Sequence, residues 1–145
     1  MKTFFYTLTC WLLLSTAAQA ASQMDTTDLS NRRLIIKLEA INPIGEPLPI
    51  GDQWKHHLFI GNRKIYEGDE LVFALDQRMP LVLGAKSVEQ DVDYDDVGIN
   101  YLILPYPELA NLDRKRYSIP VEVFENAGPK YAEKAVWKFS IQIYR

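Results

Sequence analysis

Near its end the chain reads AVWKFSIQI from Ala135 to Ile143, and this stretch decides the fold. Apolar residues fall at every second position of it, and mostly polar residues stand between them. Successive side chains of a β-strand point to opposite faces of a sheet, so this period of two is typical of a half-buried antiparallel strand. The inward-facing row is Ala135, Trp137, Phe139, Ile141 and Ile143, and the outward-facing row includes Lys138, Ser140 and Gln142.

The same period recurs from Arg33 onward, and turn residues separate the segments. Gly61-Asn62 predicts a tight hairpin, Gly68-Asp69 predicts the next turn, and Asn126–Pro129 breaks the chain before the last strand. A short helical turn is expected at most, around Pro107–Arg114. The sequence therefore predicts an all-β fold, a single antiparallel β-sandwich of about eight strands, rather than a βαβ sheet. The expected strands are 33–41, 54–60, 63–67, 70–76, 80–89, 97–104, 117–125 and 133–144.

The first residues have the pattern of a cleavable export signal. Lys2 supplies the positive charge, Phe4–Leu14 is the apolar stretch, and Ala18-Gln19-Ala20 fits the cleavage site. The apolar run is too short to span a bilayer, so no stable membrane insertion is expected. We expect delivery to a bacterial periplasm. The expected organisation is a signal peptide at 1–20, a flexible polar leader at 21–32 and the β-sandwich domain at 33–145.

Composition narrows the classes of function. Export would leave 125 residues, the size of one domain with a full hydrophobic core. It would also remove Cys10, the only cysteine, which excludes disulfides and thiol chemistry from the mature domain. The whole chain has a net charge of −3, and loss of Lys2 makes the domain more acidic. Nucleic acids and anionic lipids require clustered positive charge, so neither is expected as a partner. The one basic run, 114–116, is expected to be a solvated turn.

Catalytic motifs are missing from the sequence. It contains no Gly-x-Ser-x-Gly elbow and no glycine-rich phosphate loop. Carboxylate pairs such as Glu122 and Glu125 are present, and glycoside hydrolysis needs only two carboxylates. Such pairs are common in a chain of this length, however, and a small sandwich leaves little room for a substrate cleft. We therefore expect that the protein is not an enzyme.

The densest group of potential ligands is the run 91–96, which reads DVDYDD. Its carboxylates repel one another, so a fold tolerates them only where they stay solvated or hold a cation. Asp91, Asp93 and Asp95 alternate and would direct three oxygen ligands one way, as a hard cation such as Ca²⁺ requires. A solvated acidic loop with no cofactor is the alternative. His56-His57 offers no metal site, because neighbours in a strand point to opposite faces.

This acidic run and the strand after it resemble the third loop of C2-type β-sandwiches. Those domains carry Asp-x-Asp, a few residues, then Asp-Asp-x-Ile/Leu-Gly and an apolar strand. Here Asp91-x-Asp93 is followed by Asp95–Gly98 and then by Ile99–Leu104. The resemblance implies a C2-like sandwich, with an immunoglobulin-like one as the alternative, and a calcium-dependent ligand- or surface-binding role. Two departures bear on calcium: the gap after Asp-x-Asp is shorter than in the family, and the expected first loop contributes fewer aspartates.

Aromatic residues in the expected loops indicate protein contacts. Tyr94 falls within the acidic run and Tyr131 falls in the last connection, and tyrosine is a preferred anchor of protein interfaces. The alternative is that most aromatics cap the ends of the core. An acidic, aromatic surface would suit a basic protein partner. The expected partner-binding residues are Asp91, Asp93, Tyr94, Asp95, Asp96, Asn126, Lys130, Tyr131 and Glu133.

In outline the chain resembles the small exported immunity proteins paired with type VI secretion effectors, notably those of vibrios that guard against a peptidoglycan-degrading toxin. The export signal, the cysteine-free mature domain and the acidic loops carry this resemblance. It implies a periplasmic antitoxin that occludes the active-site cleft of a protein toxin or effector, such as a cell-wall hydrolase. A homodimer is compatible with it. Two alternatives stay open: a calcium-dependent C2-like binding domain, and a structural envelope subunit with an open sheet edge.

Overall fold

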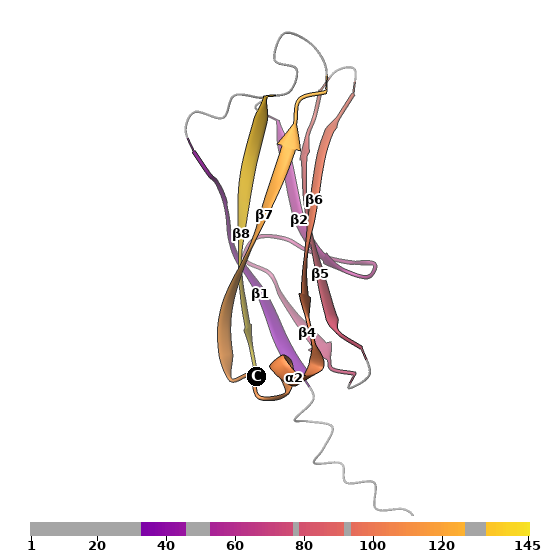
Figure 1. Cartoon of the computed structure of the whole chain (residues 1–145), viewed down its shortest axis with the longest axis vertical. Helices are drawn as coiled ribbons and strands as arrows, with labels where there is room; N and C mark the ends of the chain where they lie inside the picture. Colours follow the sequence, from indigo (N-terminus) through magenta and orange to yellow (C-terminus); the bar gives the residue numbers. More distant parts are fainter. Residues whose placement is uncertain (1–32, 46–52, 77–78, 92–93, 127–132) are drawn as a thin grey trace, which may run out of the picture. The chain divides into compact units, whose positions relative to one another are not determined.

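The computed structural model describes residues 33–45, 53–76, 79–91, 94–126 and 133–145, and Figure 1 shows two β-sheets facing each other. Each sheet has four antiparallel strands, in the orders β4-β1-β8-β7 and β3-β2-β5-β6. The predicted all-β sandwich is therefore confirmed. The expected signal peptide and leader lie outside the described residues. No helix in the described part of the chain is long and apolar enough to cross a membrane.

Every strand begins and ends within three residues of its predicted position. The turn at Gly61-Asn62 forms as predicted, with Ile60 paired to Arg63 on either side of it. A short helix, α2, overlaps the first half of the expected helical turn. The elements are β1 (Arg33–Pro43), β2 (Trp54–Ile60), β3 (Arg63–Ile65), β4 (Glu70–Ala74), β5 (Leu81–Glu89), β6 (Asp96–Leu104), α2 (Tyr106–Ala110), β7 (Arg114–Phe124) and β8 (Lys134–Tyr144).

The basic run Arg114–Arg116 corrects one sequence expectation. Instead of a solvated turn it forms the first three residues of β7, because β8 continues to Tyr144 and Arg114 pairs with that residue. The side chains nevertheless stay in solvent. The guanidinium carbon of Arg114 lies 4.9 Å from the centre of the Tyr144 ring, and Arg116 forms an ion pair with Glu39. The run is thus a solvated strand end, and its charge is partly neutralised.

The core lies between the two sheets and is built from the alternating rows. In β8 the whole predicted inward row is buried, from Ala135 to Ile143. It packs with the inward rows of β1 and β5, which include Leu34, Ile36 and Leu83. Burying each large apolar side chain contributes roughly 1.5–3 kcal/mol, so the core alone can hold a sandwich that has no disulfides.

Two edge strands, β6 and β7, join the sheets along one side of the sandwich. The Cβ of a residue at position 98 would lie 2.1 Å from the carbonyl oxygen of Glu122, so only glycine lets the two backbones approach this closely. Nearby, the Asn100 side chain donates a hydrogen bond to the Pro120 carbonyl oxygen at 2.7 Å. This contact fixes the start of β6 against the end of β7, and these two segments position the candidate site.

Candidate functional site

The described residues of the two regions expected to contact a partner, 91–96 and 126–133, lie at one end of the sandwich. At this end, β5 leads into β6 and β7 leads into β8 (Figure 1). The link is direct, because the backbone N–H and the side-chain amide of Asn126 both donate hydrogen bonds to Oδ1 of Asp96. We call this end the acidic tip and define it by its described polar and aromatic residues: Glu89, Asp91, Tyr94, Asp95, Asp96, Glu125, Asn126 and Glu133.

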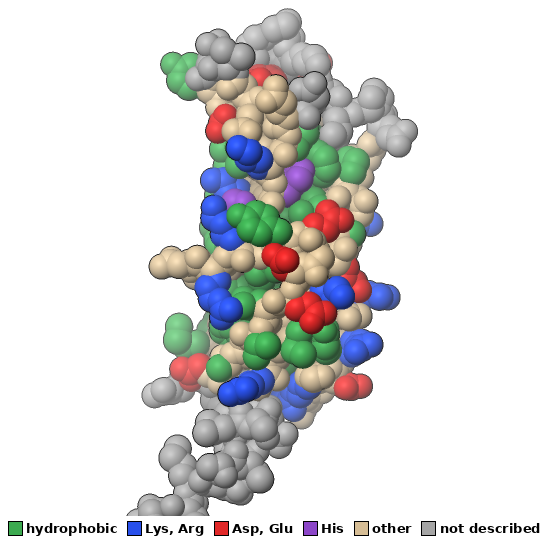
Figure 2. All heavy atoms as spheres, turned by 180° about the vertical axis from the view of Figure 1, so that it is seen from behind, with side chains coloured by type: hydrophobic (Ala, Val, Ile, Leu, Met, Phe, Trp, Pro, Cys, Tyr) green, Lys and Arg blue, Asp and Glu red, His purple; other side chains and the backbone are tan. Residues whose placement is uncertain are grey.

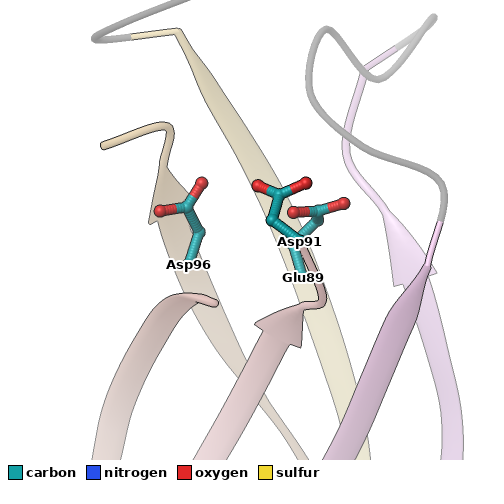
Figure 3. A group of neighbouring side chains, drawn as sticks. All are labelled: Glu89, Asp91 and Asp96. Carbon is teal, nitrogen blue, oxygen red and sulfur yellow. The ribbon is translucent and has the colours of Figure 1, made fainter. Parts of the chain in front are cut away.

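Strand alternation places two carboxylates of the tip in the interior. Glu89 continues the inward row of β5 after Ala85 and Ser87, and Asp96 begins the inward row of β6. The two residues are cross-strand partners, and they are only 2% and 1% exposed. Glu89 and Asp96, together with the exposed Asp91, each bring one carboxylate oxygen within 4.8 Å of the others (Figure 3).

The pKa of one carboxyl group in the acidic cluster is strongly raised. Burial raises the pKa of Glu89 to about 7, aided by its hydrogen bond with Asp91 and by the charges of Asp91, Asp96 and Glu125. Oε2 of Glu89 and Oδ2 of Asp96 are buried and have no hydrogen-bond partner within the described residues. Burying an uncompensated carboxylate is costly, so this cluster favours either a proton or a bound cation. Oxygen ligands of this kind suit a hard cation such as Ca²⁺.

The sequence-predicted ligand set differs from the set that the structure brings together. Of Asp91, Asp93 and Asp95, only Asp91 belongs to the cluster within the described residues. Asp95 is exposed and outside the cluster, and Asp93 lies outside the described residues. Sequence reasoning missed Glu89, although the inward row that contains Ala85 and Ser87 points to it.

The remaining predicted contact residues fall into two groups. Tyr94 is 79% exposed, and Asp91, Asp95 and Glu133 are also exposed, so a partner can reach these side chains, of which Asp91 is hydrogen-bonded to Glu89. Asn126 is exposed, but its amide is engaged by Asp96. Two further predicted residues, Lys130 and Tyr131, lie outside the described residues.

The histidine pair divides between the two faces of its sheet, as the alternation predicts. The His56 ring faces inward, 4.1 Å from the Trp137 ring centre, and its Nδ1 is 3.0 Å from Oγ of Ser87. Burial, with a smaller effect of His57, lowers the pKa of His56 to about 4. His57 faces outward near Lys64 and Lys86, and burial together with these charges lowers its pKa. The two rings therefore do not share a metal.

Comparison with protein-family models, curated proteins and solved structures finds no match.

Proposed function

We propose that the chain is an exported, non-enzymatic binding protein that neutralises a protein toxin or enzyme by placing its acidic tip in the partner's active-site cleft. The observation that carries this proposal is the pair of hydrogen bonds that joins Asp96 to Asn126 at one end of the sandwich. Described residues that are far apart in sequence thus lie together at this end. A type VI secretion effector that degrades the cell wall is the proposed partner, as the resemblance of the sequence suggests.

The chemistry of the tip suits the occlusion of a cleft. Tyr94 offers a large, exposed amphipathic ring at low entropic cost, and tyrosines are frequent hot spots of interfaces. Asp91 and Asp95 surround it with negative charge, which complements a basic cleft and speeds association. The part-buried hydrogen bonds between Asn126 and Asp96 join the ends of β6 and β7 at the tip, which lowers the ordering cost of binding.

Tyr94→Ala is expected to weaken binding to the neutralised partner at least tenfold, which corresponds to about 1.4 kcal/mol or more. The partner is first captured from periplasmic and secreted fractions on the immobilised mature protein, and affinities are then measured by calorimetry. The matched control is Tyr66→Ala, because Tyr66 is another exposed tyrosine, at 54%, but lies between β3 and β4. Equal losses for the two variants would argue against a binding role of the tip.

A calcium-dependent binding domain is the second candidate function. The observation that favours it is the convergence of Glu89, Asp91 and Asp96 oxygens within 4.8 Å, with two buried oxygens left unpartnered in the described structure. Backbone carbonyls and water would have to complete the coordination, since Ca²⁺ takes six to eight oxygen ligands.

If this second function holds, 1 mM Ca²⁺ raises the melting temperature by several degrees, because a site with a Kd near 10 μM contributes about 2.7 kcal/mol at this concentration. Asp91→Asn is expected to abolish the rise. Asp95→Asn is the control, since Asp95 is a nearby exposed aspartate that the cluster does not include. A melting temperature that does not change in millimolar Ca²⁺ would contradict calcium binding.

The sheet edges do not favour the third expected function, a structural envelope subunit. Strand addition requires an exposed edge of useful length. In the described sheets, edges β6 and β7 lie against each other, and Pro120 of β7 has no N–H to donate. The opposite edges, β3 and β4, have three and five residues. Neither offers the long edge that donor-strand pairing uses.

A further inference from the structure

A second surface, on the outer face of the β3-β2-β5-β6 sheet, is apolar where solvent-facing strands are ordinarily polar. Along β5 and β6, the outward-facing cross-strand pairs are Val82 with Ile103, Gly84 with Tyr101, Lys86 with Ile99, and Val88 with Val97. Five of these residues form what we call the outer strip: Val82, Val97, Ile99, Tyr101 and Ile103. Their side chains are 40–62% exposed. A contiguous exposed apolar patch of this kind on a small domain marks an interaction site.

The outer strip borders an open depression of about 410 Å³ that is basic. Its lining consists of His57, Phe59, Gly61, Asn62, Lys64, Lys86 and Ile99, which includes two lysines and no carboxylate. In the described residues neither Lys64 nor Lys86 forms an ion pair, although the chain as a whole is acidic. Figure 2 shows blue basic side chains beside a purple histidine and green hydrophobic side chains on one side of the molecule.

The floor of the depression is fixed by a glycine. A Cβ at position 84 would lie 2.1 Å from Cζ of Phe59, so the absence of a side chain at Gly84 lets the end of this ring approach β5. The Tyr101 ring then meets Phe59 edge-on, with centroids 6.0 Å apart. Ile99, the cross-strand partner of Lys86 on β6, extends this apolar floor. The surface is therefore formed before any ligand arrives, which lowers the cost of binding.

We propose that this face binds an acidic segment of a protein partner that also carries an apolar side chain. Carboxylates of the segment pair with Lys64 and Lys86, while the apolar side chain packs on Phe59 and Ile99 and the segment continues over the outer strip. Charge complementarity selects this occupant, because the depression presents positive charge in an otherwise acidic protein. Two lysines are too few for an anionic membrane, which attracts clusters of four to eight basic residues.

The proposal does not depend on the acidic tip or on the neutralisation of a toxin. It needs only the lysines and the apolar floor, and its experiment uses no toxin. If the toxin function is wrong, the acidic-segment site is unaffected, and the reverse also holds.

The test is an NMR titration of the ¹⁵N-labelled mature chain with the peptide acetyl-ELDFE-amide. We expect saturable shifts of the amides around Phe59, Lys64, Lys86 and Ile99, and at least tenfold weaker binding to Lys86→Glu. Lys138→Glu is the matched control, because Lys138 is an exposed lysine on β8 of the other sheet. Lys64→Glu provides a second variant in case Lys86→Glu does not fold.

Three results would overturn the proposal. The first is an absence of localised shifts at millimolar peptide. The second is equal binding by Lys86→Glu and Lys138→Glu, or equal binding of the basic peptide acetyl-KLKFK-amide. The third is concentration-dependent self-association that Lys86→Glu abolishes, which would assign the face to a second copy of the chain.

Discussion

Replacing Gly98 with alanine is expected to destabilise the fold by about 3 kcal/mol or more. The new Cβ would lie 2.1 Å from the Glu122 carbonyl oxygen and 2.8 Å from Cγ2 of Val123. The Glu122 oxygen belongs to a paired backbone and cannot move aside alone, so β6 and β7 must separate. Overpacking that shifts backbone belongs to the costly end of core substitutions. Urea unfolding measures the loss, as a lower midpoint at unchanged slope.

Gly84→Ala is the informative comparison for this prediction. Its Cβ would also meet an atom at 2.1 Å, but that atom is at the end of the Phe59 ring, which is half-buried on the outer face and can swing outward. We expect a loss of about 1 kcal/mol. If Gly84→Ala costs as much as Gly98→Ala, the close approach of β6 and β7 is not what makes Gly98 necessary.

Glu89→Gln is expected to stabilise the metal-free protein at pH 8 by about 3 kcal/mol. In the fold the pKa of Glu89 is raised to about 7, chiefly by burial and then by Asp91, Asp96 and Glu125. A carboxyl group with a raised pKa stabilises the fold fully below its unfolded pKa, and this contribution is lost as the pH rises through the folded pKa. Glutamine carries no charge, so it avoids this loss. The benefit should vanish below about pH 4.5.

The measurement is the difference in unfolding free energy between the variant and the natural chain, from pH 4 to 8 in EDTA. His56 titrates with the opposite sign over part of this range, because its pKa is lowered to about 4 and its contribution is lost as the pH falls. Its effect is the same in both proteins and cancels in the difference. A difference that does not change with pH would show that Glu89 is not the buried, perturbed carboxyl group.

Most of the fold could be predicted because local alternation and turn residues agree along the chain. The period of two in β8 and the Gly61-Asn62 turn determine strand positions without any knowledge of distant contacts. The run Arg114–Arg116 was harder, because its charged side chains look like a turn. It forms a strand because β8 offers backbone partners as far as Tyr144, and such pairing is a long-range property.

The candidate site was less predictable because it depends on register between strands. An acidic run at 91–96 is visible in the sequence, but the partnership of Glu89 with Asp96 requires knowing how β5 pairs with β6. The basic depression depends on four strands at once, and Phe59 and Lys86 carry no recognisable motif. Sequence patterns find the elements, whereas sites formed across elements need the paired structure.

Inhibition kinetics of the captured partner test most directly the proposal that the acidic tip blocks the active site of a secreted enzyme. The mature protein is predicted to inhibit the partner's hydrolysis of cell-wall material stoichiometrically and in competition with substrate, and Tyr94→Ala should weaken this inhibition at least tenfold. Capture of a partner whose activity is unchanged by saturating protein, or inhibition that Tyr94→Ala leaves intact, would contradict the account.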